Sequence, residues 1–461
     1  MRRVAYVHSD ALVSAADCLP ANEGRASLVH SLVSSLQVLG TDEDLQSDRE
    51  HLACCRVVEP RPATRDELCR FHDPRYIDAV LGTHSETMSD SDDDEDDDNS
   101  SASSDSSPRT FGLAGSSDEP PRKRKKVDSL GLQDDCPVFP ELAEYVKLVG
   151  GASMTAAREL RDGEADVAIN WTGGRHHARR GEAAGFCYVQ DAVLAIMELR
   201  SAPQRRKPAS PEPSQGPCVA SPSPSSPSLP PLPPRISRVL YLDLDLHHGD
   251  GVESAFFTTP YVLTLSVHLH APLFYPSTGA LDSSGPSNPK AQGAAHALNV
   301  ALEPGCAEET LRRVFASCVE RLEEAYDPDA VVLQLGVDGL AGDPCKEWNL
   351  NLASLGYAVE HVLQWNRRTL LLGGGGYDSP NAARAWAYLT SVAHGRALPL
   401  DTPVPPDLPS AQYELFAPSF TLDVPEGYMR DANTEETLRR VEKTFEVYEE
   451  KLRTRWKRVA D

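Results

Sequence analysis

Short apolar runs alternate with longer helix-like segments along most of the chain. The six best strand candidates are VAYVH (4–8), VAIN (167–170), VLYLDLDL (239–246), VLTLSVH (262–268), VVLQLGVD (331–338) and TLLL (369–372). Near-continuous apolar strands that alternate with helices are typical of a mostly parallel sheet with helices on its faces. The pattern therefore predicts an α/β fold.

Polar and glycine-rich turns follow several of these runs, namely WTGGRHH, HHGDG, DGLAGDP and GGGGY. In open parallel sheets, ligands bind at the carboxyl ends of the strands, so we expect these turns to converge on one site. Residues 435–456 form a further predicted helix, because apolar side chains recur there at three- and four-residue spacing. We expect this stripe to dock on the domain rather than to form a coiled coil.

Two segments interrupt the globular composition. Residues 85–129 contain SDSDDDEDDDNSS and then PRKRKKV, and this composition predicts disorder. Residues 201–234 are rich in Pro and Ser and are expected to form a linker or exposed loop, since proline interrupts helices and central strands. We therefore expect one domain over residues 1–425, interrupted by both inserts, and a helix packed on it within residues 426–461.

Composition limits the classes of partner and location. The formal net charge of −24 disfavours direct nucleic-acid binding and favours basic partners such as Lys-rich peptides. The ten cysteines include no CxxC pair, which indicates a reducing compartment. The sequence contains neither an apolar signal-peptide core nor the ~18 apolar residues of a membrane span, so we expect no membrane association. The basic run 122–126 is similar to a nuclear import signal, with a solvated charge run as the alternative.

Carboxylates and a histidine gather where the apolar run 239–246 ends. Asp243, Asp245 and His247 are two residues apart, so we expect them on the same side of the ending strand. Asp245 and His247 supply two ligands of a zinc site with open positions, and Asp338, at the end of run 331–338, is the third. Any one of them alone could instead cap a helix or be satisfied in the core. Their combination favours a metal.

Histidines suited to proton transfer follow another strand. His176 and His177 lie in the turn WTGGRHH that follows VAIN, on the face where the site is expected. Asp243 and Asp250 remain after the metal ligands are assigned, and each can orient one imidazole through its second ring nitrogen. A structural role for one of the two histidines is the alternative. The sequence does not decide which histidine transfers the proton.

Four glycines, Gly373–Gly376, follow the run TLLL and permit a close approach of the backbone to a ligand. They bring Tyr377 over the site, where its phenol can donate a hydrogen bond to a developing oxyanion. The segment does not have the GxGxxG spacing of a dinucleotide site.

These motifs resemble the class I zinc-dependent histone deacetylases. The matching segments are GRHHARRGEAAGFCYVQDAV (174–193), YLDLDLHHGDGVESAF (241–256), QLGVDGLAGDP (334–344) and LLGGGGY (371–377). The resemblance covers almost the whole chain outside the inserts, and AGDP is similar to the branch of human histone deacetylase eight and its fungal relatives. It implies a single arginase/deacetylase-like α/β domain, with a parallel sheet of about eight strands and helices on both faces.

The resemblance also implies an activity, which is hydrolysis of N6-acetyl-lysine in histones or other nuclear proteins such as cohesin. Chromatin regulation and transcriptional repression in the nucleus follow from it, with the cytoplasm as a further location. Carried over by position, it makes Asp245, His247 and Asp338 the ligands of one Zn²⁺ and Tyr377 the oxyanion donor. It pairs His176 with Asp243 and His177 with Asp250, and it favours His177 as the group that transfers the proton.

Further positions carry roles that the resemblance implies. The acyl-lysine tunnel and its rim would be lined by Asp135, Gly185, Phe186, Tyr275 and Cys345. A K⁺ ion would be held by Asp243, by main-chain oxygens of Asp245 and His247, and by Ser266 and Val267. Arg25 and Arg175 would line a product cavity, and Arg175 departs from the Leu or Trp usual at its position.

Two other functions remain open. An inactive scaffold could bind acetylated peptides, although its usual sign is loss of a ligand, a paired histidine or the tyrosine, and the chain retains all of them. An amidohydrolase for acetylpolyamines or longer acyl chains would retain the same catalytic groups.

Overall fold

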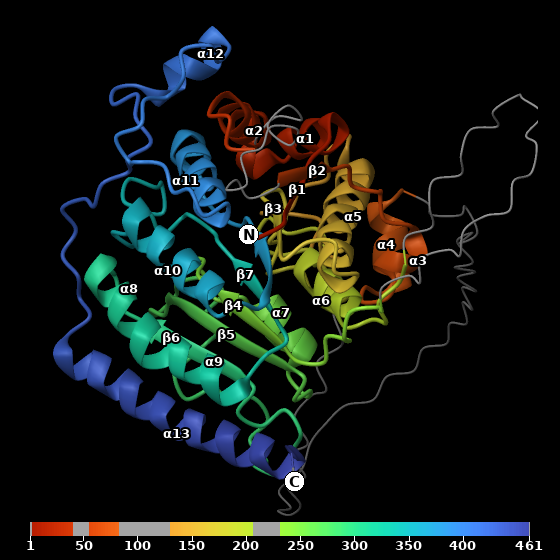
Figure 1. Ribbon diagram of the computed structural model, residues 1–461, viewed down its shortest axis with the longest axis vertical. Helices are drawn as coiled ribbons and strands as arrows, with labels where there is room; N and C mark the ends of the chain where they lie inside the picture. The colour runs from red at the N-terminus through yellow and green to blue at the C-terminus, as the bar shows by residue number, and fades with distance from the viewer. Residues whose placement is uncertain (1, 40–54, 83–129, 206–230, 461) are drawn as a thin grey trace, which may run out of the picture.

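A parallel sheet forms the centre of the protein (Figure 1). The computed structural model describes residues 2–39, 55–82, 130–205 and 231–460. The 8-stranded sheet has the order β2-β1-β3-β8-β7-β4-β5-β6, and every neighbouring pair is parallel. The strands are β1 (Val4–Val7), β2 (Cys55–Val58), β3 (Val167–Asn170), β4 (Val239–Asp243), β5 (Val262–Leu269), β6 (Ala297–Leu302), β7 (Ala330–Gln334) and β8 (Arg368–Leu372).

Each of the six predicted runs contains a strand, but some boundaries differ. β4 ends at Asp243 and β7 at Gln334, earlier than the predicted ends at 246 and 338. β2 and β6 were not predicted. β2 is a four-residue edge strand that is mostly not buried, so its sequence lacks a strong apolar signal.

Helices cover both faces of the sheet and create two apolar cores. Alternate strand residues enter opposite cores; for example, Leu240 and Leu242 face one core, and Val239 and Tyr241 the other. The first core includes α2 (Arg25–Ser35), α8 (Glu308–Val314), η2 (Phe315–Val319), α9 (Glu320–Tyr326), α10 (Leu352–Gln364), α11 (Ser379–Ala393) and α13 (Glu435–Ala460). The second includes α1 (Asp10–Asp17), α3 (Arg65–Leu68), α4 (Pro74–Val80), α5 (Leu142–Arg161), α6 (Asp191–Leu199) and α7 (Asp250–Phe256). Shorter helical segments are η1 (Pro20–Asn22), α12 (Ser410–Tyr413) and η3 (Glu414–Phe416).

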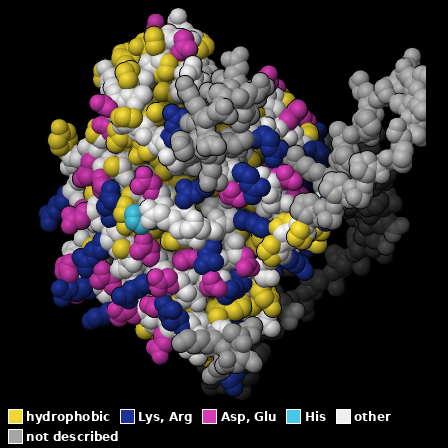
Figure 2. Space-filling view, in the orientation of Figure 1, with side chains coloured by type: hydrophobic (Ala, Val, Ile, Leu, Met, Phe, Trp, Pro, Cys, Tyr) yellow, Lys and Arg dark blue, Asp and Glu magenta, His cyan; other side chains and the backbone are white. Residues whose placement is uncertain are grey.

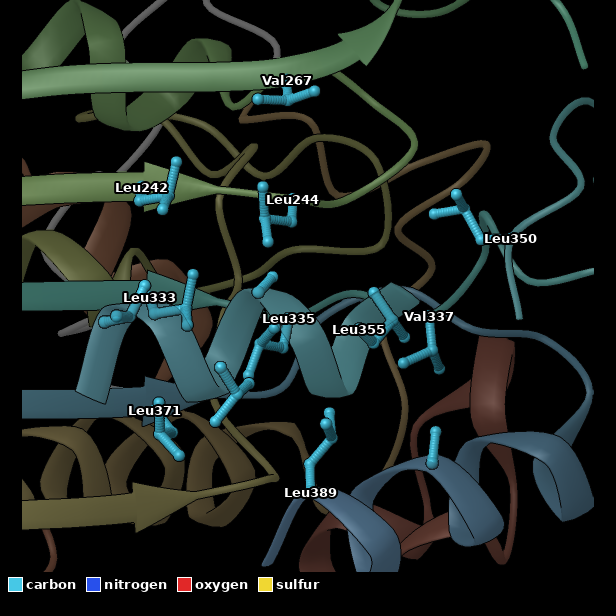
Figure 3. Close-up of a cluster of buried hydrophobic side chains, with 14 of the residues drawn as sticks. Leu242, Leu244, Val267, Leu333, Leu335, Val337, Leu350, Leu355, Leu371 and Leu389 are labelled. Atoms are coloured by element: carbon cyan, nitrogen blue, oxygen red, sulfur yellow. The ribbon is translucent and has the colours of Figure 1, made fainter. Parts of the chain in front are cut away.

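Leucines from the central strands stack across the sheet in the first core (Figure 3). Leu242, Leu333 and Leu371 are fully buried and come from β4, β7 and β8. Leu355 of α10 and Leu389 of α11 pack into the same cluster. Truncation of such a leucine to alanine costs about 2–5 kcal/mol, because little of the resulting cavity collapses. This packing holds the ends of the central strands in place.

The C-terminal helix α13 runs along the outside of α9 (Figure 1). The apolar residues at three- and four-residue spacing in the sequence are all buried on one side of it, namely Leu438, Val441, Phe445, Tyr448 and Leu452. Arg313 of α8 forms ion pairs with Glu435 and Glu442 of α13.

The acidic-to-basic insert 85–129, including the basic run 122–126, lies outside the described residues. The ends of the Pro/Ser-rich insert, residues 201–205 and 231–234, contain no helix or strand. Within the described part of the chain, no helix has the length and apolar character needed to cross a membrane.

Candidate metal centre and catalytic site

The predicted site residues come together above the middle of the sheet. β3, β8, β7 and β4 are consecutive neighbours in the sheet. Because these strands are parallel, the turns that follow them meet at one edge. The turns carry the histidine pair, the glycine run with Tyr377, Asp338 and the segment DLDLHHGD.

Turns, rather than a continuing strand, position the first two predicted zinc ligands. β4 ends at Asp243, so the expectation that Asp243, Asp245 and His247 share one side of a strand was wrong. Asp243 Oδ1 accepts the N–H of Asp245 at 3.1 Å, and Asp245 Oδ1 accepts the N–H of His247 at 3.0 Å. Aspartate side chains that bond to backbone two residues ahead form turns of this kind. The two successive turns bring Asp245 and His247 over the sheet edge.

The three predicted zinc ligands meet at one ring nitrogen. His247 Nδ1 lies 3.3 Å from Asp245 Oδ1 and 3.0 Å from Asp338 Oδ2. The other oxygen of each carboxylate is held by the surrounding chain. Asp338 Oδ1 accepts the N–H of Leu246 at 3.0 Å, and Asp245 Oδ2 accepts the N–H of Gly375 at 2.9 Å.

The electrostatics of this group favour a cation. Asp245 and Asp338 are each only 1% exposed. Burial and the neighbouring Asp245 raise the pKa of Asp338, since two adjacent carboxylates are costly to ionise away from water. Burial alone would lower the pKa of His247, but its hydrogen bonds to both carboxylates raise it to about 10. A positive charge at this position is therefore strongly stabilised.

A cysteine also belongs to this donor group. Donor atoms of His247, Asp338 and Cys345 all lie within 4.8 Å of one another. This mutually close set contains Cys345 instead of Asp245. Because Asp245 still lies 3.3 Å from the imidazole, we regard all four side chains as one donor group. Imidazole, carboxylate and thiolate are the ligand types that zinc takes in proteins.

Two histidine–aspartate pairs lie beside the donor group. His176 Nδ1 is 2.9 Å from Asp243 Oδ2, and His177 Nδ1 is 2.8 Å from Asp250 Oδ1. These are the pairings that the family resemblance implies. The two rings are in contact, with centroids 3.9 Å apart, and both histidines are buried.

The aspartates of the two pairs have different surroundings. Asp243 is fully buried and also accepts the hydroxyl of Tyr241 at 2.7 Å. Asp250 Oδ2 is 2.9 Å from Arg179, whose side chain is about half exposed (49%). Burial raises the pKa of Asp250, but His177 and Arg179 together lower it to about 2. Asp250 is therefore ionised at neutral pH.

Aromatic and glycine residues form a narrow wall next to His177. Gly185 has φ +53°, and a Cβ there would lie 2.5 Å from His177 Cδ2 and 2.8 Å from the Tyr275 hydroxyl. Only glycine fits this position without displacing the histidine. Tyr275 packs edge-on against His177, with ring centroids 4.9 Å apart, and Phe186 packs edge-on against Tyr377 at 5.8 Å.

Asp343, a residue that was not predicted from the sequence, connects the segment of Cys345 to that of Tyr377. Its Oδ1 accepts the N–H of Cys345 at 2.9 Å, and its Oδ2 accepts the N–H of Tyr377 at 2.8 Å. It is buried, so these bonds are protected from water. The motif AGDP contains Asp343 and was the sequence signal that could have identified it. At the rim, Asp135 Oδ2 accepts the N–H of Gly185 at 2.7 Å and so supports the wall.

Other buried polar residues support the site and were not predicted. Asp191 of VQDAV accepts the N–H groups of Gly174 and Arg175, at 3.0 and 2.7 Å. Gln334, the last residue of β7, donates to Asp245 Oδ2 at 3.1 Å. Both positions stood inside or beside motifs in the sequence, but their partners are distant in the chain.

Two buried arginines lie behind the site. Arg25 donates to the carbonyl oxygens of Gly376 and Gly374 at 2.7 and 3.1 Å, and Arg175 donates to that of Thr172 at 3.1 Å. Burial, and then the nearby Arg175, lower the pKa of Arg25 to about 9. Both side chains line a narrow space of about 10 Å³, room for about one water molecule. Arg175 also lines the pocket that holds His176, His177 and Tyr377.

The predicted potassium residues lie on neighbouring strands. Asp243 of β4 is paired with Ser266 of β5 in the sheet register. Ser266 Oγ lies 2.9 Å from His268 Nδ1. The side chain of Val267 points into the apolar core, so only its main chain could contribute a ligand (Figure 3).

The fold and the site together combine an open, all-parallel α/β sheet with a possible metal-ligand group and two paired histidines at the carboxyl edge of that sheet. A family model described as the histone deacetylase domain matches residues 19–207 and 233–393. The chain therefore belongs to the histone deacetylase family. The gap in the match falls within the Pro/Ser-rich insert.

Curated relatives refine this assignment. Histone deacetylase 8 of Danio rerio is 34% identical over 447 residues, which cover 96% of this chain and 94% of the relative. Histone deacetylase 8 of Xenopus tropicalis is 33% identical, with 95% of each chain covered. Histone deacetylase 1 of Homo sapiens is 33% identical over 84% of this chain and 64% of its own length. The protein is a class I lysine deacetylase that resembles the histone deacetylase 8 branch.

Proposed function

We propose that the protein catalyses the zinc-dependent hydrolysis of N6-acetyl-lysine in histones or other nuclear proteins, with release of acetate and free lysine. One observation carries the proposal: the carboxylates of Asp245 and Asp338 both lie within 3.3 Å of His247 Nδ1, directly beside two histidine–aspartate pairs. The donor set and its affinity for positive charge fit Zn²⁺. When bound, zinc would polarise the acetamide carbonyl and activate water for attack.

The two histidines would move the protons. Asp250 and Asp243 accept hydrogen bonds from Nδ1 of His177 and His176, which leaves each Nε2 to exchange protons. We propose that His177 takes the proton from the attacking water and later delivers one to the lysine amine. Its contacts with Gly185 and Tyr275 support this choice, because they set it against the tunnel wall.

The remaining residues would hold the substrate. The Tyr377 phenol would donate a hydrogen bond to the developing oxyanion. Gly185, Phe186 and Tyr275 would enclose the lysine methylenes and exclude water, while Asp135 and Cys345 would lie at the tunnel's rim. Asp135 already accepts a backbone N–H from Gly185, so one of its oxygens would remain for the substrate backbone.

Arg25 and Arg175 would line the cavity that receives acetate. Two guanidinium groups favour an anion, but the space between them holds little more than one water molecule. Passage of acetate would therefore require one side chain to move. Arg175 is the better candidate, since its Nε is buried without a hydrogen-bond partner, whereas Arg25 is fixed by two carbonyl oxygens.

A K⁺ ion would be a second metal, close to the first. Asp243, the main-chain oxygens of Asp245 and His247, and Ser266 and Val267 would provide hard oxygen ligands at the edge of β4 and β5. If K⁺ binds there, turnover should fall when K⁺ is removed. A larger organic cation should not restore it.

The proposed partners are acetylated lysines of histone tails or of other nuclear proteins such as cohesin, and the proposed location is the nucleus. The sequence run 122–126 supports nuclear import. Direct nucleic-acid binding is not proposed, because the chain carries a net charge of −24. On the face in Figure 2, basic and acidic side chains are interspersed and form no continuous basic patch.

Deacetylation of an acetyl-lysine peptide by the purified protein tests the proposal. Chelation should abolish turnover, and added Zn²⁺ should restore it. Full activity after complete metal removal would refute the zinc mechanism. The same assay with acetylpolyamines and long-acyl peptides separates the alternatives, and peptide binding without turnover of any substrate would indicate a scaffold.

A further inference from the structure

Cys345 is unusually placed for a residue at the wall of a substrate site. Its sulfur lies within 4.8 Å of donor atoms of both His247 and Asp338. In a tetrahedral zinc site, sulfur and nitrogen ligands are about 3.6 Å apart, given bond lengths of about 2.3 and 2.05 Å. Side-chain movements of at most about 1.2 Å would therefore bring the sulfur of Cys345 to this separation from the donor atoms of His247 and Asp338.

The segment around Cys345 is fixed so that the sulfur stays near the donor group. Asp343 accepts the backbone N–H of Cys345 at 2.9 Å and also the backbone N–H of Tyr377. A turn also holds Asp343 in place, because the backbone carbonyl oxygen of Asp343 accepts the N–H of Lys346 at 3.0 Å. The cysteine is only partly exposed and packs against the apolar core. Its position is thus set by buried contacts and not by a free loop.

We infer that Cys345 is a fourth ligand of the metal, which closes the site in the absence of substrate and is displaced when an acyl-lysine enters. The inference rests on the metal site of the proposed function. Structural zinc sites have four protein ligands, whereas catalytic sites keep a position open for water or substrate. A ligand set of Asp245, His247, Asp338 and Cys345 would hold the resting enzyme in the closed form.

The exchange balances without an oxidant or reductant. When sulfur donates an electron pair to the metal, the thiol releases one proton to solvent, and one sulfur–metal bond forms. When the substrate carbonyl takes that position, the sulfur–metal bond breaks and the thiol regains one proton. A soft sulfur donor also favours zinc over harder ions such as Mn²⁺.

Cobalt substitution tests the inference directly, because sulfur bound to Co²⁺ gives a charge-transfer absorption that oxygen and nitrogen ligands do not. The full-length protein is stripped of metal and loaded with Co²⁺, alongside C345S, C345A and the control C187S. Cys187 lines the pocket that holds Asp245 and His247 but is not part of the donor group, so it controls for loss of a nearby thiol. We expect the absorption in the wild-type protein and in C187S, its loss in both Cys345 variants, and its decrease when a saturating acetyl-lysine peptide is added.

Zinc affinity and kinetics give two further measurements. Competition with a chelator should show zinc binding at least about tenfold weaker in C345S and C345A, since even the loss of an outer partner costs 10–100-fold. The kcat/KM of the zinc-loaded variants should rise, because the competitor for the open position is gone.

Cobalt binding without sulfur absorption in the wild-type protein, or unchanged zinc affinity in both Cys345 variants, would overturn the inference and leave the proposed function intact. Failure of the wild-type protein to bind either metal would instead overturn the proposed function.

Discussion

The substitution Asp250→Asn tests whether His177 transfers the proton. Asp250 Oδ1 lies 2.8 Å from His177 Nδ1, and its carboxylate is ionised because His177 and Arg179 lower its pKa to about 2. A hydrogen bond to a charged group contributes about 1.5–3 kcal/mol and a neutral one about 0.5–1.5 kcal/mol. Loss of the charge therefore costs about 1–2 kcal/mol, or roughly 5- to 30-fold in turnover. If the amide also imposes the other tautomer, the loss increases to as much as roughly 10⁴-fold.

The assay compares kcat, KM and zinc content for D250N and the control R179Q. D250N should lower kcat and leave zinc content unchanged, because the contacts of Asp250 are to His177 and Arg179 rather than to the metal group. R179Q removes the other, half-exposed partner of Asp250, and an exposed ion pair of this kind contributes only about 0–1 kcal/mol. Its turnover should therefore stay within about fivefold of wild type. Wild-type kcat in D250N would refute the assignment of proton transfer to His177.

Three further predictions concern catalysis, acid stability and packing. Tyr377→Phe should lower kcat by about 10²–10³ if the phenol stabilises the oxyanion, and unchanged kcat with bound zinc would exclude that role. Burial lowers the pKa of His30 to about 3 and those of His72 and His296 to about 4. In the unfolded chain these histidines bind a proton near pH 6.5, whereas in the folded protein they stay neutral to a lower pH. Protonation therefore favours the unfolded chain, so the stability of the folded protein is highest above pH 6.5 and decreases as the pH falls toward 4. Between pH 7.5 and 5 each should lower the free energy of unfolding by up to roughly 2 kcal/mol, and equal stability in denaturant titrations at both values would contradict this. Phe445→Ala should lower the free energy of unfolding by about 3–5 kcal/mol, because Phe445 is buried against the domain. Val447→Ala, on the half-exposed side of α13, should change that free energy by less than about 0.5 kcal/mol. Equal effects of the two substitutions would mean that α13 is not docked in solution.

The α/β class and the positions of the main strands along the chain could be predicted because both faces of the sheet are buried. A strand such as β3, VAIN, is fully buried, so its apolar run coincides with its boundaries. β2 could not be found in this way, since a half-exposed edge strand needs no continuous apolar sequence. The ends of β4 and β7 were missed for another reason: Leu244, Leu246, Leu335 and Val337 remain buried after the strands end, so hydrophobicity continues into the turns.

The site could be anticipated in its residue types but not in its supporting contacts. The two-residue spacing and the ligand types selected Asp245 and His247 from the sequence. The cost of a buried carboxylate without a metal or hydrogen-bond donors selected Asp338. The family resemblance added the pairing of histidines with aspartates, which spacing alone left open. Asp343 and Asp191 were missed because most of their partners are backbone N–H groups, which carry no sequence signal. The side-chain partner of Asp191, the Ser153 hydroxyl, is distant in the sequence.

The hydrogen bonds of the aspartates explain how such closely spaced charges are kept in place. One oxygen of each of Asp243, Asp245 and Asp338 accepts a backbone N–H from a turn that follows a strand, at 2.9–3.1 Å, and the second oxygen of Asp245 also accepts the N–H of His247 at 3.0 Å. The other oxygen of each carboxylate contacts an imidazole, either His176 or His247. The backbone bonds fix the direction of the carboxylate before any ion or substrate binds, so little reorganisation remains for catalysis. The same arrangement explains why the spacing of two residues matters although β4 has ended. A side chain that bonds two residues ahead both forms the turn and orients the next proposed ligand.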